Sequence, residues 1–205
     1  FSLFADTASA LIGLELDVTG EDNLWAQRPA VFVFNHQSKT DVVIAARLLR
    51  RDIAGVGKQE IKRETPILGK VLELGGVVFI DRSNASSAID AMAPLVDAMS
   101  NEGKSVVIAP EGTRTLGPRL APFKKGAFVT AVNAGVPILP VCTSSYLEGF
   151  DLANLDNGTA HIKVLEPIET TGLTLDNVDQ LMLDIHLAMM DGIQEMDQKS
   201  RQSRA

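Results

Sequence analysis

The chain has 205 residues, of which 45% are hydrophobic, and it carries a formal net charge of −7. This length suits one well-buried core, and the acidic balance argues against a protein that coats nucleic acid. Cys142 is the only cysteine, so no internal disulfide can form, which is typical of a reducing compartment. Three widely spaced histidines without a CxxC pattern do not predict a zinc site, and no apolar run is long enough to span a membrane.

The N-terminal segment, residues 1–22, is expected to be helical and to lie near a membrane. Its apolar groups Phe1–Phe4 and Leu11-Ile12 fit the end of a longer apolar helix, and the chain starts with Phe1 rather than Met. We therefore expect this segment to be truncated. The alternative is a surface helix that caps the core.

Short runs rich in β-branched residues alternate with helical patterns along the rest of the chain. The predicted strands are Val31–Phe34, Ile53–Val56, Gly76–Ile80, Ser105–Ala109, Pro137–Val141 and His161–Val164. The predicted helices are Asp41–Arg50, Pro66–Leu74, Ala85–Ser100, Lys125–Ala134 and Leu175–Gln194. This alternation predicts an α/β fold in one domain over residues 1–205, with a largely parallel central sheet flanked by helices. The polar residues 196–205 are expected to form a flexible tail.

Four polar motifs each come directly after a different predicted strand. They are His36–Asp41, Lys58–Glu60, Asp81–Asn84 and Glu111–Arg114. The carboxyl ends of parallel strands form one edge of the sheet, which is where open α/β sheets bind their ligands. We therefore expect the four motifs to converge on one cleft.

The spacing of His36 and Asp41 constrains how the two side chains can meet. On a continuous helix, residues five apart point about 140° away from each other, since each residue advances about 100°. The pair can form a hydrogen bond only where a loop runs into a helix. Ser38 is the predicted N-cap of that helix, and an acid three residues later is also an ordinary helix-start signature. A catalytic base with its orienting acid and a capped helix start are both compatible with this pattern.

Cations follow three of the predicted strands. Lys58, Arg82 and Arg114 would bring three positive charges to one cleft, which suits a dianionic phosphate. The alternative is three separate surface ion pairs. In the turn that ends at Arg114, Glu111 is a candidate for holding a substrate hydroxyl, and Gly112 lets the backbone approach a ligand closely. The same turn could also be a plain Glu–Arg pair.

The chain resembles the glycerolipid acyltransferases, and more narrowly the bacterial 1-acyl-glycerol-3-phosphate (lysophosphatidic acid) acyltransferases. The resemblance covers Asn23 to Val164, with four blocks in the family's order. The blocks are Asn35–Asp41, Gly76–Arg82, Pro110–Arg114 and Val136–Val141.

The resemblance implies an α/β domain with its active site at the sheet edge and a membrane-engaging helical element at the N-terminus. It implies transfer of a fatty acyl group from acyl-CoA or acyl carrier protein to the 2-hydroxyl of 1-acyl-glycerol-3-phosphate, which gives phosphatidic acid. His36 is then the general base, and Asp41 orients and supports the imidazolium.

Further roles follow from the same resemblance. The acceptor phosphate is expected to bind the cations Lys58, Arg82 and Arg114. Glu111 and Gly112 are expected to shape the glycerol site, and Thr113 is counted with them among the substrate-binding residues.

The resemblance also implies work at the cytoplasmic face of the cell membrane, either peripherally or through an anchoring segment absent from this chain. The expected partners are lysophosphatidic acid, the acyl thioester, the membrane surface and acyl carrier protein, with no nucleic acid, no cofactor and no metal. No Ser or Cys nucleophile stands out, so direct transfer is favoured over an acyl-enzyme. Two alternatives remain open: an acyltransferase for glycerol-3-phosphate or another lysolipid, and a non-catalytic phospholipid-binding module.

Overall fold

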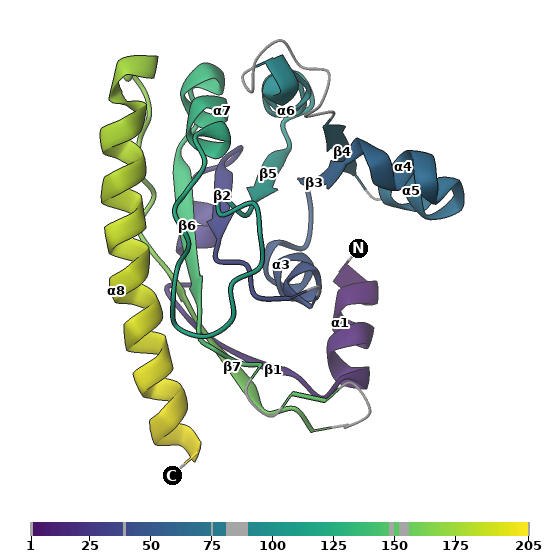
Figure 1. Cartoon of the computed structure of the whole chain (residues 1–205), viewed down its shortest axis with the longest axis vertical. Helices are drawn as coiled ribbons and strands as arrows, with labels where there is room; N and C mark the ends of the chain where they lie inside the picture. Colours follow the sequence, from purple (N-terminus) through teal and green to yellow (C-terminus); the bar gives the residue numbers. More distant parts are fainter. Residues whose placement is uncertain are drawn as a thin grey trace.

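A computed structural model describes residues 2–38, 40–74, 76–80, 90–147, 150–151 and 156–204 (Figure 1). The described residues include a seven-stranded sheet with the order β1-β7-β6-β2-β5-β3-β4. Its strands are β1 (Glu15–Thr19), β2 (Val31–Phe34), β3 (Ile53–Lys58), β4 (Val77–Ile80), β5 (Ser105–Ile108), β6 (Ile138–Thr143) and β7 (Thr159–Val164). The five strands from β6 to β4 are mutually parallel, whereas β7 runs antiparallel to β6. The prediction of a largely parallel sheet is confirmed.

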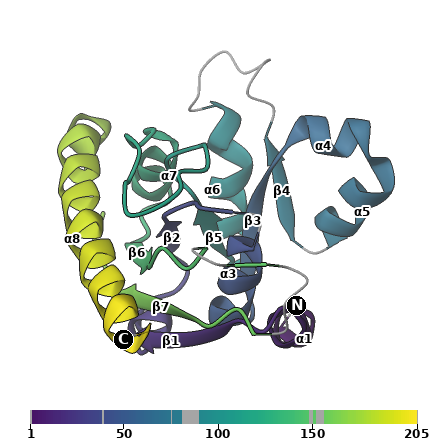
Figure 2. The same ribbon diagram turned by 60° about the horizontal axis from the view of Figure 1, so that its bottom comes forward.

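Helices cover both faces of this sheet. They are α1 (Ser2–Leu11), α2 (Asn23–Ala26), α3 (Asp41–Leu49), α4 (Gln59–Glu64), α5 (Pro66–Leu74), α6 (Ala93–Ser100), α7 (Gly126–Ala134) and α8 (Val178–Arg204). One core cluster joins the sheet to α6, α7 and α8, and a second joins it to α3. Figures 1 and 2 show α4 and α5 projecting beside β4, at the opposite end of the sheet from α8.

The central strand β2 supplies both cores. Val31 and Val33 belong to the cluster under α6 to α8, while Phe32 and Phe34 belong to the cluster under α3. This division follows from the alternation of side chains along a strand. All four side chains are buried, as expected for a central parallel strand that reads as a continuous apolar run. The residues that follow Phe34 therefore emerge at the middle of the sheet.

Three elements were not predicted from the sequence. β1 is a half-exposed edge strand of mostly polar residues that pairs with β7, α2 is a helix of four residues, and α4 is a single short charged helix. None of the three has the apolar periodicity that identifies a buried element. The predicted helix over residues 85–100 is α-helical only from Ala93, after a 3₁₀ turn at Asp90–Met92, and residues 85–89 lie outside the described part of the chain.

The segment from residue 196, which was expected to be a flexible tail, is helical, because α8 continues to Arg204. One side of this segment is buried: Met196, Asp197 and Ser200 are almost inaccessible to solvent at helical spacing. The Asp197 carboxylate also accepts hydrogen bonds from the backbone and the side chain of Ser145. These tertiary contacts extend the helix beyond the point where its apolar pattern fades.

The N-terminal segment is helical only in part. α1 packs against α3 and buries Ala5 and Ser9, as the surface-helix alternative expects, and the chain then enters β1. Within the described residues, no helix is both long and apolar enough to cross a membrane.

Candidate active site

His36 and Asp41 meet where the chain passes from β2 into α3. Residues 35–38 form neither helix nor strand, and α3 begins at Asp41. The His36 Nδ1 atom lies 2.7 Å from Asp41 Oδ2, at hydrogen-bond distance. The loop-to-helix junction that the spacing requires is therefore present.

Asp41 accepts hydrogen bonds on both carboxylate oxygens. Besides the imidazole, Oδ2 accepts the backbone N–H groups of Gln37 at 2.7 Å and of Ser38 at 2.9 Å. The prediction that Ser38 is the N-cap is wrong: Thr40 holds that position, and the Ser38 hydroxyl accepts the Thr40 N–H at 2.9 Å. The carboxylate thus fixes the turn and holds the imidazole at the same time.

Tyr146 is a member of this site that none of the four sequence motifs predicts. Its hydroxyl donates to Asp41 Oδ1 at 2.6 Å and lies 2.6 Å from the Thr40 hydroxyl. Burial, reinforced by the neighbouring Asp41 charge, raises the pKa of Tyr146, so the hydroxyl stays protonated and donates. A signal for it exists, because the polar run Thr143–Ser145 begins one residue after the predicted strand Pro137–Val141, much as the four polar motifs follow their strands.

Glu111 ties the β5 turn to the backbone of His36. Its Oε1 accepts the His36 N–H at 2.8 Å and its Oε2 accepts the Ala121 N–H at 2.9 Å. The His36 carbonyl in turn accepts the Thr115 N–H at 2.8 Å. Both backbone polar groups of His36 are therefore held by the 111–115 turn. The side chain of Glu111 is 2% exposed, so in this structure it braces the loop.

Gly112, Thr113 and Arg114 form the exposed part of the same turn. Gly112 has φ +66°, in the left-handed region that favours glycine, and the Lys124 side chain lies over it. Arg114 has no ion-pair partner among the described residues, and the Glu111 oxygens are occupied by amides. The plain Glu–Arg pair that the sequence also allowed is therefore not formed.

The remaining cations are placed only in part. Lys58 is the last residue of β3, where it pairs with Ile80 of β4, and its side chain is outside the described structure. Arg82 lies outside the described residues altogether. β2, β5 and β3 are adjacent and parallel, so the His36, Glu111 and Lys58 motifs do share one edge of the sheet.

Asn35 and Gln37 fasten the His36 loop to the end of β6. The Asn35 amide exchanges two hydrogen bonds with the backbone of Thr143, at 2.9 Å and 2.8 Å. Gln37 Nε2 donates to the carbonyl of Ser144 at 2.8 Å. The loop around the imidazole is thus held by β5 on one side and by β6 on the other.

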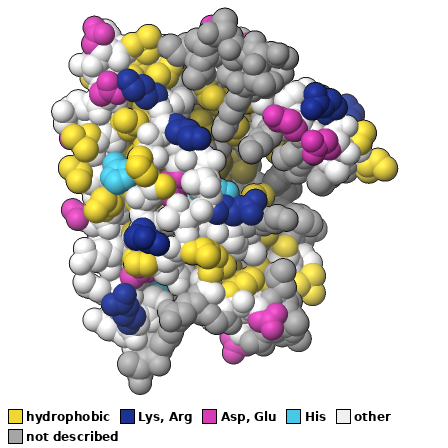
Figure 3. All heavy atoms as spheres, viewed as in Figure 1, with side chains coloured by type: hydrophobic (Ala, Val, Ile, Leu, Met, Phe, Trp, Pro, Cys, Tyr) yellow, Lys and Arg dark blue, Asp and Glu magenta, His cyan; other side chains and the backbone are white. Residues whose placement is uncertain are grey.

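The loop between β5 and α7 crosses the face drawn in Figure 3. Lys and Arg side chains are spread over the central part of this face, among hydrophobic ones, while most acidic side chains lie nearer its edges (Figure 3). The charged side chains in view at the centre of this face are therefore mainly basic, although the chain as a whole carries a charge of −7.

Comparison with known proteins assigns this arrangement to a family. The acyltransferase family model matches residues 15–144, which include His36, Asp41 and the Glu111 turn. The chain belongs to the acyltransferase family. Tyr146 lies two residues beyond the matched range.

Individual relatives of this acyltransferase carry closely related names. The 1-acyl-sn-glycerol-3-phosphate acyltransferase of Haemophilus influenzae is 35% identical over 83% of this chain and 70% of its own length. The human 1-acyl-sn-glycerol-3-phosphate acyltransferase beta is 40% identical over 86% of this chain and 64% of its own length. The crystal structure of the Thermotoga maritima 1-acyl-sn-glycerophosphate acyltransferase shares the fold, with a TM-score of 0.74 at 22% identity over 95% of this chain and 78% of that one.

The His36 imidazole of the acyltransferase is arranged to accept a proton. Asp41 Oδ2 accepts two backbone amides as well, so the imidazole Nδ1 carries the hydrogen at this contact and the neutral ring presents a lone pair on Nε2. No described residue bonds Nε2, and 27% of the side chain is exposed. An imidazole arranged in this way is suited to take a proton from a hydroxyl at Nε2.

Cys142 is not a nucleophile in this acyltransferase. Its side chain is fully buried beneath α8, and burial raises the pKa of the thiol to about 12. The thiolate, which is the reactive form, is therefore scarce at neutral pH. Direct attack by a substrate hydroxyl is the chemistry that His36 and Asp41 support.

Proposed function

We propose that the chain transfers a fatty acyl group from acyl-CoA or acyl carrier protein to the 2-hydroxyl of 1-acyl-glycerol-3-phosphate, giving phosphatidic acid. The observation that carries this proposal is the 2.7 Å contact between His36 and Asp41 at the carboxyl edge of a parallel sheet. The names of the relatives supply the acceptor.

In the proposed reaction, the acceptor hydroxyl gives its proton to His36 Nε2 as its oxygen attacks the thioester carbonyl carbon. A carbon–oxygen bond forms, the carbon–sulfur bond breaks, and the leaving thiolate takes the proton back from the imidazolium. Asp41 stabilises the imidazolium through Nδ1, and a positioned base of this kind contributes roughly 10²–10⁴-fold. The donor is a substrate, and the reaction uses no cofactor and no metal.

The acceptor phosphate is proposed to bind Arg114, Lys58 and Arg82. Arg114 supports this role because it is exposed, unpaired among the described residues and only one residue from Thr115, which bonds the His36 carbonyl. Gly112 and Thr113 would lie along the glycerol part. Glu111 would shape this part of the site through the backbone that it holds.

We further propose that the enzyme works at the cytoplasmic face of a membrane, because its acceptor and product are lipids. Large exposed apolar side chains support a membrane-facing surface, with Ile67 85% and Leu74 78% exposed on α5. Sedimentation with vesicles that contain phosphatidic acid tests this part, and a chain that never binds the vesicles contradicts it.

The central experiment measures phosphatidic acid formed from lysophosphatidic acid by wild type, His36→Ala and Asp41→Asn. We expect both variants to lose about 10²-fold or more in kcat while staying folded. An acceptor panel with glycerol-3-phosphate and phosphate-free acceptors runs under the same conditions. Wild-type rates in both variants would contradict the mechanism, and preference for a phosphate-free acceptor would contradict the phosphate site.

A further inference from the structure

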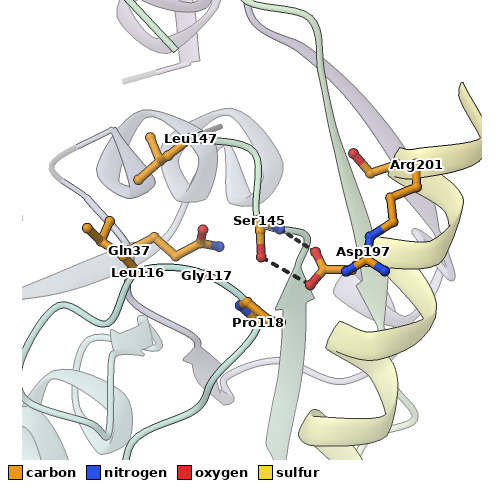
Figure 4. Close-up of a pocket in the computed structure, with 9 residues that line it drawn as sticks. Gln37, Leu116, Gly117, Pro118, Ser145, Leu147, Asp197 and Arg201 are labelled. Carbon is orange, nitrogen blue, oxygen red and sulfur yellow. Dashed lines mark hydrogen bonds between the residues drawn. The ribbon is translucent and has the colours of Figure 1, made fainter. Parts of the chain in front are cut away.

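A cavity of about 360 Å³ lies beside the loop that carries His36 (Figure 4). Figure 4 shows Gln37 and Leu147 on one side of it and Asp197 and Arg201 of α8 on the other. Its volume falls within the range of small-molecule sites, which is roughly 300–1,000 Å³.

The cavity wall is continuous with the backbone around the catalytic base. Gln37 is the chain neighbour of His36. Leu116, in the loop between β5 and α7, is the chain neighbour of Thr115, whose N–H donates to the His36 carbonyl. A ligand that fills the cavity would therefore lie against the same loop that presents the imidazole.

Gln37 contributes a buried acceptor that no described residue satisfies. Its Nε2 is oriented toward two carbonyls, of Ser144 at 2.8 Å and of Thr143 at 3.3 Å, so Oε1 cannot take that place. The side chain is 3% exposed, and Oε1 has no hydrogen-bond partner. Buried acceptors in folded proteins are almost always paired, so Oε1 calls for an N–H or O–H donor that the described residues do not supply.

The rest of the wall divides into an apolar part and a charged end. Leu116, Pro118 and Leu147 line the apolar part. On α8, the Asp197 carboxylate is held by the Ser145 N–H at 2.5 Å and the Ser145 hydroxyl at 3.0 Å. Arg201 lies one helical turn further on, exposed and without an ion-pair partner among the described residues.

We propose that this cavity binds the 4′-phosphopantetheine arm of the acyl donor. The arm carries amide N–H groups that suit Gln37 Oε1, a dimethyl-substituted carbon chain that suits the apolar wall, and a phosphate that suits Arg201. Acyl-CoA and acyl carrier protein share this arm, so one site serves both donors. The inference rests on the proposed function, because the arm ends in the thioester that His36 acts beside.

Donor kinetics test the site with variants outside the catalytic pair. We expect Arg201→Glu to raise KM about tenfold or more for acyl-CoA and for acyl carrier protein, with the acceptor KM unchanged. Acyl-pantetheine, which has no phosphate, should be unaffected by this change. Ser200 also lines the cavity, so Ser200→Leu would fill part of it and should raise KM for all three donors. Lys104→Glu is the control: it makes the same change of charge beside the amino end of β5, and it should leave KM for all three donors unchanged.

Direct binding separates this inference from the proposed function. Calorimetry with CoA, dephospho-CoA and pantetheine measures binding without acyl transfer. Arg201→Glu should weaken the binding of CoA and of dephospho-CoA equally and leave the binding of pantetheine unchanged. If the protein transfers no acyl group but CoA binding depends on Arg201 and Ser200, the proposed function fails and the site stands. The site is overturned if neither variant changes CoA binding or donor KM, which would leave a water-filled cavity. The site is also overturned if Arg201→Glu raises KM for acyl-CoA but leaves KM for the acyl carrier protein donor unchanged.

Discussion

The His36 side chain is held by one charged contact, while its backbone is fixed by two others. Asp41 binds Nδ1, Glu111 binds the backbone N–H, and Thr115 binds the carbonyl. A base fixed in this way loses little freedom when the acceptor binds, which is the benefit of a positioned catalytic group. The residues that orient His36 should therefore affect kcat more than KM.

Tyr146→Phe should lower kcat about tenfold and leave both KM values within about twofold. The change removes the hydrogen bond to Asp41 Oδ1, which is a contact to a charged group worth about 1.5–3 kcal/mol. Part of that loss appears as lower stability, so thermal unfolding is measured beside the rate. An unchanged kcat would show that Oδ1 needs no protein donor to support the imidazolium.

Glu111→Gln separates a bracing role from a substrate-binding role. The glutamine amide can accept from only one of the two N–H groups that Glu111 serves, so a buried donor is left facing an NH₂ group. We expect a stability loss of about 1–3 kcal/mol and a lower kcat, with the acceptor KM nearly unchanged. Glu102→Gln, on the exposed turn before β5, is the matched control. A selective rise in acceptor KM would instead assign Glu111 to the substrate.

At the scale of elements, the site is built from strand ends. β6, β2 and β5 lie side by side and parallel, so the segments that follow them meet at one edge. The segment after β6 supplies Tyr146, the one after β2 supplies His36, and the one after β5 supplies Glu111. α8 then packs across β6 and β7 and closes the Ser145 side of the site through Asp197.

Gly192→Ala should destabilise the protein although alanine favours helix. A Cβ at this position would lie 2.8 Å from Cys142 Sγ and 3.3 Å from Cys142 Cβ, so α8 would have to move away from β6. Overpacking costs about 1–3 kcal/mol, which exceeds the gain of about 1 kcal/mol in helix propensity. We expect a melting temperature several degrees lower, partly restored in the double variant with Cys142→Ala. A melting temperature equal to or above wild type would show that α8 has room there.

At the scale of the whole molecule, Asp17 joins three distant segments. Its carboxylate binds Lys199 of α8 at 2.7 Å and His161 of β7 at 2.8 Å, while Asp17 itself belongs to the edge strand β1. These hydrogen bonds, first from Lys199 and then from His161, lower the pKa of Asp17 below its ordinary 3.8. The charged form is therefore favoured by folding.

Asp17→Asn should lower the melting temperature at pH 7 by a few degrees, with the end of α8 loosened. Because the folded pKa is the lower one, the stabilisation is present above the ordinary pKa and disappears as pH falls through the folded value. The difference between wild type and variant should shrink below about pH 4. Thermal unfolding across this range measures it. A difference independent of pH would mean that packing, not charge, accounts for the effect.

The sequence alone determined the parallel sheet and the placement of the motifs on it. Apolar runs identified six of the seven strands, and the polar residues after Phe34 and Ile108 marked the edge where His36 and Glu111 meet. These features depend on local periodicity, which the chain expresses within a few residues. β1 was not predicted, because its side chains are half exposed and mostly polar and because its pairing with β7 is a long-range contact.

Tertiary structure decided which polar groups face one another. His36 and Asp41 are five residues apart and were paired from their spacing, whereas Tyr146 reaches Asp41 across 105 positions and Asp197 reaches Ser145 across 52. Likewise, Glu111 was predicted as a substrate-binding residue from its place after a strand, but only the packed structure shows that its two oxygens accept the backbone N–H groups of His36 and Ala121. Local sequence specifies strands and turns because their geometry repeats over a few residues. The partners of a buried carboxylate are specified only when packing removes water and leaves each donor and acceptor to its nearest neighbour.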